Sequence, residues 1–254
     1  MDSEKERRLL EKYGLAGFLR RHTYDKPPVG LTELERGCRE FEVAEPRDSM
    51  YRVSRFLLQQ WWGDSKKLVD ALSVLLLTWN SAFYRYGAFD ESLVETCLNE
   101  NSSKIEAFGK REIDSFVDAD YSEVERLFLT FHRALGHADA KGESPVATGK
   151  ALHLLAPSFF PIWDGYIAEA YNCPFTNEFP QVAYFVFCGR MREFAIGLKE
   201  ELTETDVTMR AWLLQKPLLK RIDEYNYVTF TLPELARQRE KRQKKAAAVK
   251  AAKQ

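Results

Sequence analysis

The sequence predicts an all-α protein, and two observations support this class. Residues that favour helices dominate the 254-residue chain, of which 45% is hydrophobic. Apolar residues recur at the three-to-four-residue spacing of amphipathic helices, and no segment sustains the apolar–polar alternation of a strand. A chain of this length can bury one sizeable core or two small lobes.

The segment 65–84 predicts the central helix, with Asp64 as its N-cap. Its middle is apolar nearly all round, which is typical of a helix inside a bundle. A second clear helix covers 121–135, where Asp120 is the expected cap. We also expect helices over 49–60, 182–198, 206–214 and 218–227, and two short helices that begin at Asp90 and Asn101.

Three regions are expected along the chain. Residues 1–46 form an N-terminal helical extension and a connector, because Pro27, Pro28 and Gly30 leave room for only one or two turns around Thr32–Arg39. Residues 47–232 form the main helical domain. Residues 233–254 form a basic tail with almost nothing to bury, so we expect a solvated or disordered extension that is helical in part.

Charge is unevenly distributed between the main body and the tail. From Arg237 onward there are eight Lys or Arg residues and one Glu, a net charge of +7, so the first 236 residues carry −8. An acidic body is a point against strong binding to a phosphate backbone. The tail itself could bind nucleic acid or acidic partners, or it could serve only as a solubilising extension.

The cysteines and the apolar runs bear on compartment and cofactors. The four cysteines are widely spaced and form no C-x-x-C motif, so we expect buried free thiols and neither a disulfide framework nor a zinc site. The charged N-terminus lacks the apolar core of a signal peptide, and the apolar run 72–79 is too short to span a bilayer. We expect a cytoplasmic protein, or a nuclear one in a eukaryote, with no metal, cofactor or membrane contact.

One segment, 144–167, predicts a helix, an apolar connection and a second helix. Ser144 can cap the first helix, Pro145 suits its first position, and Pro157 ends it. Asp164 stands where the second helix begins. Lys150 on the first helix and Asp164 therefore form a possible chemical pair.

Each candidate in this segment has two interpretations. Lys150 lies beside a partly apolar helix face, so it could be a desolvated amine nucleophile or an ordinary solvated lysine. Asp164 could stabilise a cation, act as a helix N-cap, or do both. His153, one turn from Lys150, could be an acid or base, or a packed and hydrogen-bonded side chain. Asn80, near the end of the central helix, could contact a ligand or cap the helix.

The order of these parts resembles the helix-hairpin-helix DNA glycosylase superfamily over roughly residues 50–228. In that family a hairpin precedes a helix that carries a lysine nucleophile in the bifunctional members. A Pro-Val-Asp-like segment follows and supplies a catalytic aspartate. Residues 161–167, Pro-Ile-Trp-Asp-Gly-Tyr-Ile, are similar, with one residue inserted before Asp164.

The resemblance implies a two-lobed helical domain that acts on a modified base in DNA without a cofactor. Lys150 would attack C1′ of the nucleotide and form a Schiff base, and Asp164 would stabilise the positive charge that develops on the sugar. The base would be flipped out of the duplex into a pocket between the lobes. Four further residues fall among the expected substrate- or DNA-binding positions: Asn80, Gly149, His153 and Trp163.

A second function stays open beside this one. The family's hairpin carries a Gly-x-Gly motif whose backbone N–H groups touch DNA phosphate. The segment 144–150, Ser-Pro-Val-Ala-Thr-Gly-Lys, has only Gly149. The alternative is a non-catalytic helical module that keeps the fold and binds a partner or ligand in the same cleft.

Overall fold

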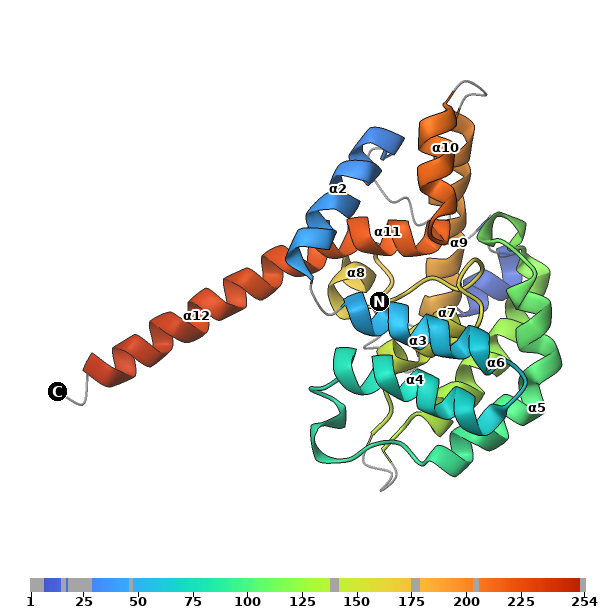
Figure 1. Ribbon diagram of the computed structural model, residues 1–254, viewed down its shortest axis with the longest axis horizontal. Helices are drawn as coiled ribbons and strands as arrows, with labels where there is room; N and C mark the ends of the chain where they lie inside the picture. The colour runs from blue at the N-terminus through green and yellow to red at the C-terminus, as the bar shows by residue number, and fades with distance from the viewer. Residues whose placement is uncertain are drawn as a thin grey trace.

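The computed structural model describes residues 7–14, 17, 29–45, 48–137, 142–174, 179–202 and 206–251. Over these ranges the chain is helical and contains no strand, so the all-α prediction is confirmed (Figure 1). The α-helices are α2 (Leu31–Ala44), α3 (Asp48–Gln60), α4 (Ser65–Trp79), α5 (Glu91–Gly109), α6 (Tyr121–Ala134), α7 (Pro145–Leu155), α8 (Gly165–Ala170), α9 (Pro180–Glu201), α10 (Val207–Leu214), α11 (Leu218–Asn226) and α12 (Leu232–Ala251).

The predicted central helix is α4. Leu72, Leu75 and Leu76 on this helix are fully buried. Asp64 caps it as expected, since its Oδ1 accepts a hydrogen bond from the Lys67 N–H at 3.2 Å. The helix ends at Trp79, earlier than the sequence indicates. Helices α3 and α4 pack against each other, and both contact α7.

The prediction of two short helices beginning at Asp90 and Asn101 is wrong for the second. One helix, α5, runs through both positions. Asn101 is buried in its middle, where its Nδ2 donates to the Cys97 carbonyl at 2.8 Å. This bond to the preceding turn satisfies the amide inside the helix, so Asn101 does not start a new one.

The connector predicted before residue 46 contains much more helix than expected. Helix α2 has 14 residues and buries Leu34, Cys38 and Phe41. It packs against α11, and a Cβ added at Gly37 would lie 2.7 Å from the Tyr225 Cδ2. The proline pair before it lies outside the described residues. The apolar spacing of α2 is that of a core helix, and its many charged side chains hide this in the sequence.

Helices α11 and α12 form one continuous helical path. A π-helical turn, η4 (Tyr227–Thr231), joins them without a break. Figure 1 shows α12 projecting away from the rest of the molecule, with α2 and α11 near its start. The described side chains from 236 to 245 are exposed. The tail is therefore a solvated extension that is helical well beyond its first turn.

Two observations on the described residues concern membrane-spanning helices and metal ligands. In the part of the chain that the structure describes, no helix combines the length and apolar character needed to cross a bilayer. Within those same ranges, His, Cys, Asp and Glu side chains form no cluster of three that could hold a metal ion. All four cysteines are buried free thiols.

Candidate functional site

Helix α7 begins as its sequence indicates. The Ser144 Oγ accepts a hydrogen bond from the Ala147 N–H at 3.2 Å, and Pro145 occupies the first helical position. The helix lies in the interior, and every residue from Ala147 to Leu155 is buried. A side chain on this helix can therefore reach α3, α4, α6 or α9, depending on its face.

Lys150 is buried, with only 7% of its surface exposed. Its Nζ donates a hydrogen bond of 2.6 Å to the Asn80 Oδ1, and the Asn80 Nδ2 lies 3.4 Å from the Ser144 Oγ. Nζ also lies 5.6 Å from the centre of the Trp79 ring. Asn80 is the C-cap residue of α4, so the end of the central helix holds the lysine amine. This burial is not that of an ordinary solvated lysine.

Asp164 caps α8, as one of its two interpretations predicts. Its Oδ1 accepts from the Ile167 N–H at 2.8 Å, and its Oδ2 accepts from the Thr231 hydroxyl at 2.7 Å. The residue is half-buried. Its carboxylate is thus oriented by α8 on one side and by the π-helical turn η4 on the other. The structure gives Lys150 and Asp164 different hydrogen-bond partners.

A second buried lysine, Lys220 on α11, lies in the same region. Its Nζ is 3.0 Å from an Asp223 oxygen, 3.4 Å from an Asp48 oxygen and 3.6 Å from a Glu224 oxygen. The faces of three rings surround it: the Nζ lies 4.4 Å from the ring centre of Phe41, 4.9 Å from that of Tyr51 and 5.2 Å from that of Trp79. We refer to Lys220, Asp48, Asp223 and Glu224 as the buried charge cluster.

Trp79 connects this cluster to Lys150. Both lysine amines lie within 6 Å of its ring, the range in which a cation is attracted to an aromatic face. Asp223 in turn lies in the electrostatic field of Asp164. Lys150, Trp79 and the buried charge cluster therefore form one connected group, which draws on α3, α4, α7 and α11.

Burial and neighbouring charges shift the pKa values of the buried charge cluster in opposite directions. Burial alone would lower the pKa of Lys220, but Asp223, Glu224 and Asp48 together raise it above its usual value. Lys220 is therefore a permanent cation at neutral pH. Burial raises the pKa of Asp223 to about 6, although Lys220 works in the opposite direction.

His153 is held inside the core by both ring nitrogens. Nδ1 lies 2.7 Å from the Phe160 carbonyl oxygen, which can only accept, so Nδ1 carries the proton. Nε2 then accepts from the Tyr51 hydroxyl at 3.0 Å. Burial lowers the pKa of His153 to about 3. This is the packed, hydrogen-bonded side chain that the second interpretation describes.

Gly149 and Trp163 also lie in the interior. Trp163 is fully buried, with its ring centre 5.4 Å from that of Tyr184 and 6.2 Å from that of Phe187. A Cβ added at Gly149 would lie 3.3 Å from the Tyr184 Cε2 and 3.4 Å from the Trp163 Cβ. Both residues therefore contribute to close packing between α7 and α9.

Sequence reasoning missed the buried charge cluster. Apolar spacing predicts helices over 49–60 and 218–227, and it predicts no charged site on either helix. A signal was present: Lys220, Asp223 and Glu224 stand at spacings of three and four, which places them on one helix face. Such a pattern usually lies on a solvated face, so only the packing of α2 and α3 over α11 reveals its burial.

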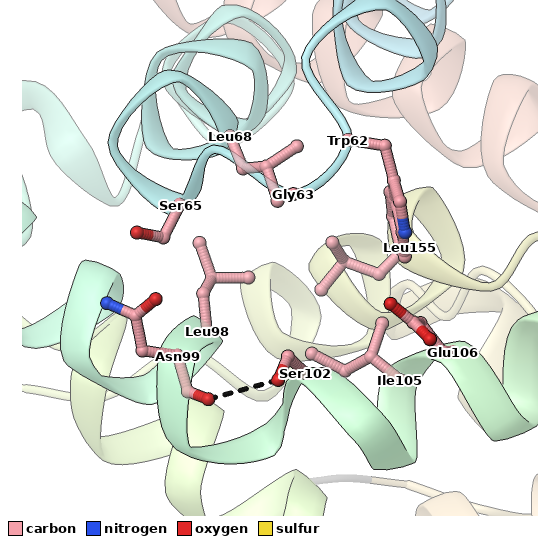
Figure 2. Close-up of a pocket in the computed structure, with 10 residues that line it drawn as sticks. All are labelled: Trp62, Gly63, Ser65, Leu68, Leu98, Asn99, Ser102, Ile105, Glu106 and Leu155. Atoms are coloured by element: carbon pink, nitrogen blue, oxygen red, sulfur yellow. Dashed lines mark hydrogen bonds between the residues drawn. The ribbon is translucent and has the colours of Figure 1, made fainter.

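A small cavity of about 50 Å³ lies where the start of α4, the middle of α5 and Leu155 meet (Figure 2). Leu68, Leu98 and Leu155 point into it. The volume suits one or two water molecules and is far below that of pockets for small-molecule ligands. Neither Lys150 nor Asp164 is among its lining residues.

Comparison of the chain with protein-family models, with curated proteins and with solved structures found no match.

Proposed function

We propose that this protein is a two-lobed, DNA glycosylase-like enzyme that acts on a modified base, with Lys150 as nucleophile and Asp164 as the stabilising carboxylate. The single observation that carries the proposal is the environment of Lys150. Its amine is buried and donates a hydrogen bond to the neutral Asn80 amide. The amine of a second lysine, Lys220, lies near the same Trp79 ring. Desolvation and a neighbouring cation are the two conditions that free a lysine amine for attack.

The reaction assigns a role to each side chain. After the Lys150 amine gives up a proton, it attacks C1′ of the nucleotide, and the bond from C1′ to the base breaks. The base leaves with the electron pair of that bond and takes up the proton that the attacking nitrogen releases. The bond from C1′ to the ring oxygen then breaks, this oxygen takes up a proton, and a Schiff base joins C1′ to Lys150. Asp164, with its carboxylate held by the Ile167 N–H and the Thr231 hydroxyl, stabilises the positive charge that develops on the sugar.

The alternative is a non-catalytic module that binds a cationic ligand or partner. The buried charge cluster favours it, because three carboxylates surround one lysine there. These carboxylates lie close to the candidate site, and negative groups oppose the approach of phosphate. The absence of a Gly-x-Gly motif from 144–150 points in the same direction.

Borohydride trapping on abasic-site DNA tests the enzyme. A Schiff base on Lys150 would be reduced to a stable secondary amine, which mass spectrometry can assign to that residue. We expect an adduct for the natural protein and for Lys66→Ala, an exposed lysine on α4, and none for Lys150→Ala. Circular dichroism should show that both variants are folded.

Asp164→Asn separates charge from structure, because asparagine caps helices as well as aspartate does. We expect this variant to release modified bases more slowly, by 10²-fold or more, since it loses an electrostatic interaction with the transition state. Absence of an adduct across abasic, deaminated, oxidised and alkylated DNA, or an adduct that persists in Lys150→Ala, would sink the proposal and favour the binding module.

A further inference from the structure

Helix α12 carries a cationic stripe on one face. At about 100° per residue, Arg237, Lys241, Lys244 and Lys245 lie within a sector of about 100°, and all four side chains are exposed. They span about 12 Å of the helix axis. Arg237 pairs with Glu234, and Lys244 pairs with Glu240 at 2.5 Å. Such exposed pairs contribute little to stability, so a polyanion can replace them.

We propose that α12 is an arm that binds duplex nucleic acid through this stripe. A duplex carries about one negative charge per 1.7 Å of its axis, so the 12 Å beside the stripe present about seven charges to four cations. Glutamine, alanine and lysine are good helix formers, which explains why the outer turns of the arm are helical although their side chains are exposed. This inference does not depend on the proposed catalytic function.

The projection of the arm explains how an acidic protein can hold a polyanion. The first 236 residues carry a net charge of −8. Lys245 lies about 20 Å along the axis from the start of α12 at Leu232. Screening at physiological salt reduces electrostatic forces over about 8 Å, so the outer turns of the arm are largely shielded from the repulsive body.

The arm begins beside the candidate site. The Thr231 hydroxyl, one residue before α12, donates to Asp164 on the N-terminal side of α8, and the Gln238 side chain donates to the Tyr166 hydroxyl on α8. Gln238 lies next to the stripe around the helix, at its Lys245 edge. A duplex held along the stripe therefore approaches the body at α8.

A charge-matched pair of double variants tests the arm in the full-length chain. Lys241→Gln with Lys245→Gln removes two charges from the stripe, and Arg239→Gln with Arg242→Gln removes two charges from the other side of the helix. The probe is a fluorescently labelled, undamaged 20-base-pair DNA duplex, and binding is followed by anisotropy from 50 to 300 mM NaCl.

We expect the natural protein to bind with a slope of about −3.6 in a plot of log K against log salt, from four phosphate contacts. The stripe variant should lose about 1.8 from this slope and on the order of 50-fold in affinity at 0.1 M salt. The control variant should bind within threefold of the natural protein. Because the probe is undamaged and only binding is read, a failure of the catalytic proposal would leave this result unchanged.

Three outcomes would overturn the inference. Equal losses in the two double variants would show a response to net charge and not to the stripe. Binding that does not change with salt would exclude phosphate contacts. Absence of duplex binding together with salt-sensitive self-association, seen by sedimentation, would assign the arm to the acidic body of a second copy of the chain.

Discussion

Replacing Lys220 with methionine should destabilise the protein strongly. The variant keeps the volume of the side chain but removes the cation from among Asp48, Asp223 and Glu224, none of which exposes more than 8% of its side chain. Asp48 retains Arg52 at 3.3 Å and Glu224 retains Lys216 at 2.9 Å, so Asp223 is affected most. Removal of one partner from a buried ion pair costs about 3–5 kcal/mol, and we expect a loss of this size at pH 7.

The loss of stability in Lys220→Met should be smaller at lower pH. Burial already raises the pKa of Asp223 to about 6 while Lys220 is present, and the pKa should rise further without that lysine. A carboxyl whose pKa is higher in the folded state than in the unfolded state stabilises the fold as it takes up its proton. Between pH 7 and pH 5 the variant should therefore recover stability relative to the natural protein.

Urea unfolding followed by circular dichroism at pH 7 and pH 5 measures both effects. Lys67→Met is the matched control, because Lys67 and Asp64 form a similar pair at 2.8 Å on the surface, where the loss should be below about 1 kcal/mol. Lys220→Met with Asp223→Asn should regain part of the lost stability. A loss at Lys220 no larger than that at Lys67, or an equal loss at the two pH values, would refute the reasoning.

Two further predictions concern α7. Burial lowers the pKa of His153 to about 3, so its contribution to stability is present above its unfolded pKa of about 6.5 and is lost as the pH falls toward 3. His153→Gln should therefore be less stable than the natural protein at pH 7 but lose less stability on acidification. Urea titrations from pH 7 to 4 will contradict this if the free energies of unfolding of the two proteins fall in parallel. Gly149→Ala should lower the free energy of unfolding by about 1–3 kcal/mol, because its Cβ would crowd Tyr184 and Trp163. Gly197→Ala on α9, where a Cβ meets nothing within 4 Å, should be neutral or stabilising by up to about 1 kcal/mol. Thermal melts that rank the two variants in the opposite order would disprove the packing argument.

Local signals in the sequence predicted most helices and the caps of the candidate site. Ser144, Pro145 and Asp164 act through neighbours a few residues away, so their roles can be inferred from spacing alone. Helix α2 was underestimated because its exposed charged residues outnumber the few side chains that it buries against α11. Asn101 was misjudged because a polar residue inside a helix looks like a cap until its bond to Cys97 is seen.

The buried charge cluster could not be predicted in the same way. Its members come from α3 and α11, which lie far apart in the sequence, and their burial depends on how α2, α3 and α4 cover α11. Helical spacing shows that Lys220, Asp223 and Glu224 share a face, but it does not show which side of the helix faces solvent. For Lys150, likewise, the sequence left burial open, and only the position of Asn80 at the end of α4 shows what its amine meets.

The π-helical turn at Tyr227–Thr231 sets the rotational phase of the arm. Because the helical path from Leu218 to Ala251 is unbroken, any residue added to or removed from this turn would rotate everything beyond it by about 100° about the helix axis. Arg237, Lys241, Lys244 and Lys245 would then turn away from α8 without any change in composition, charge or helix content. The number of residues in this one turn therefore determines which face of α12 lies toward α8 and Asp164.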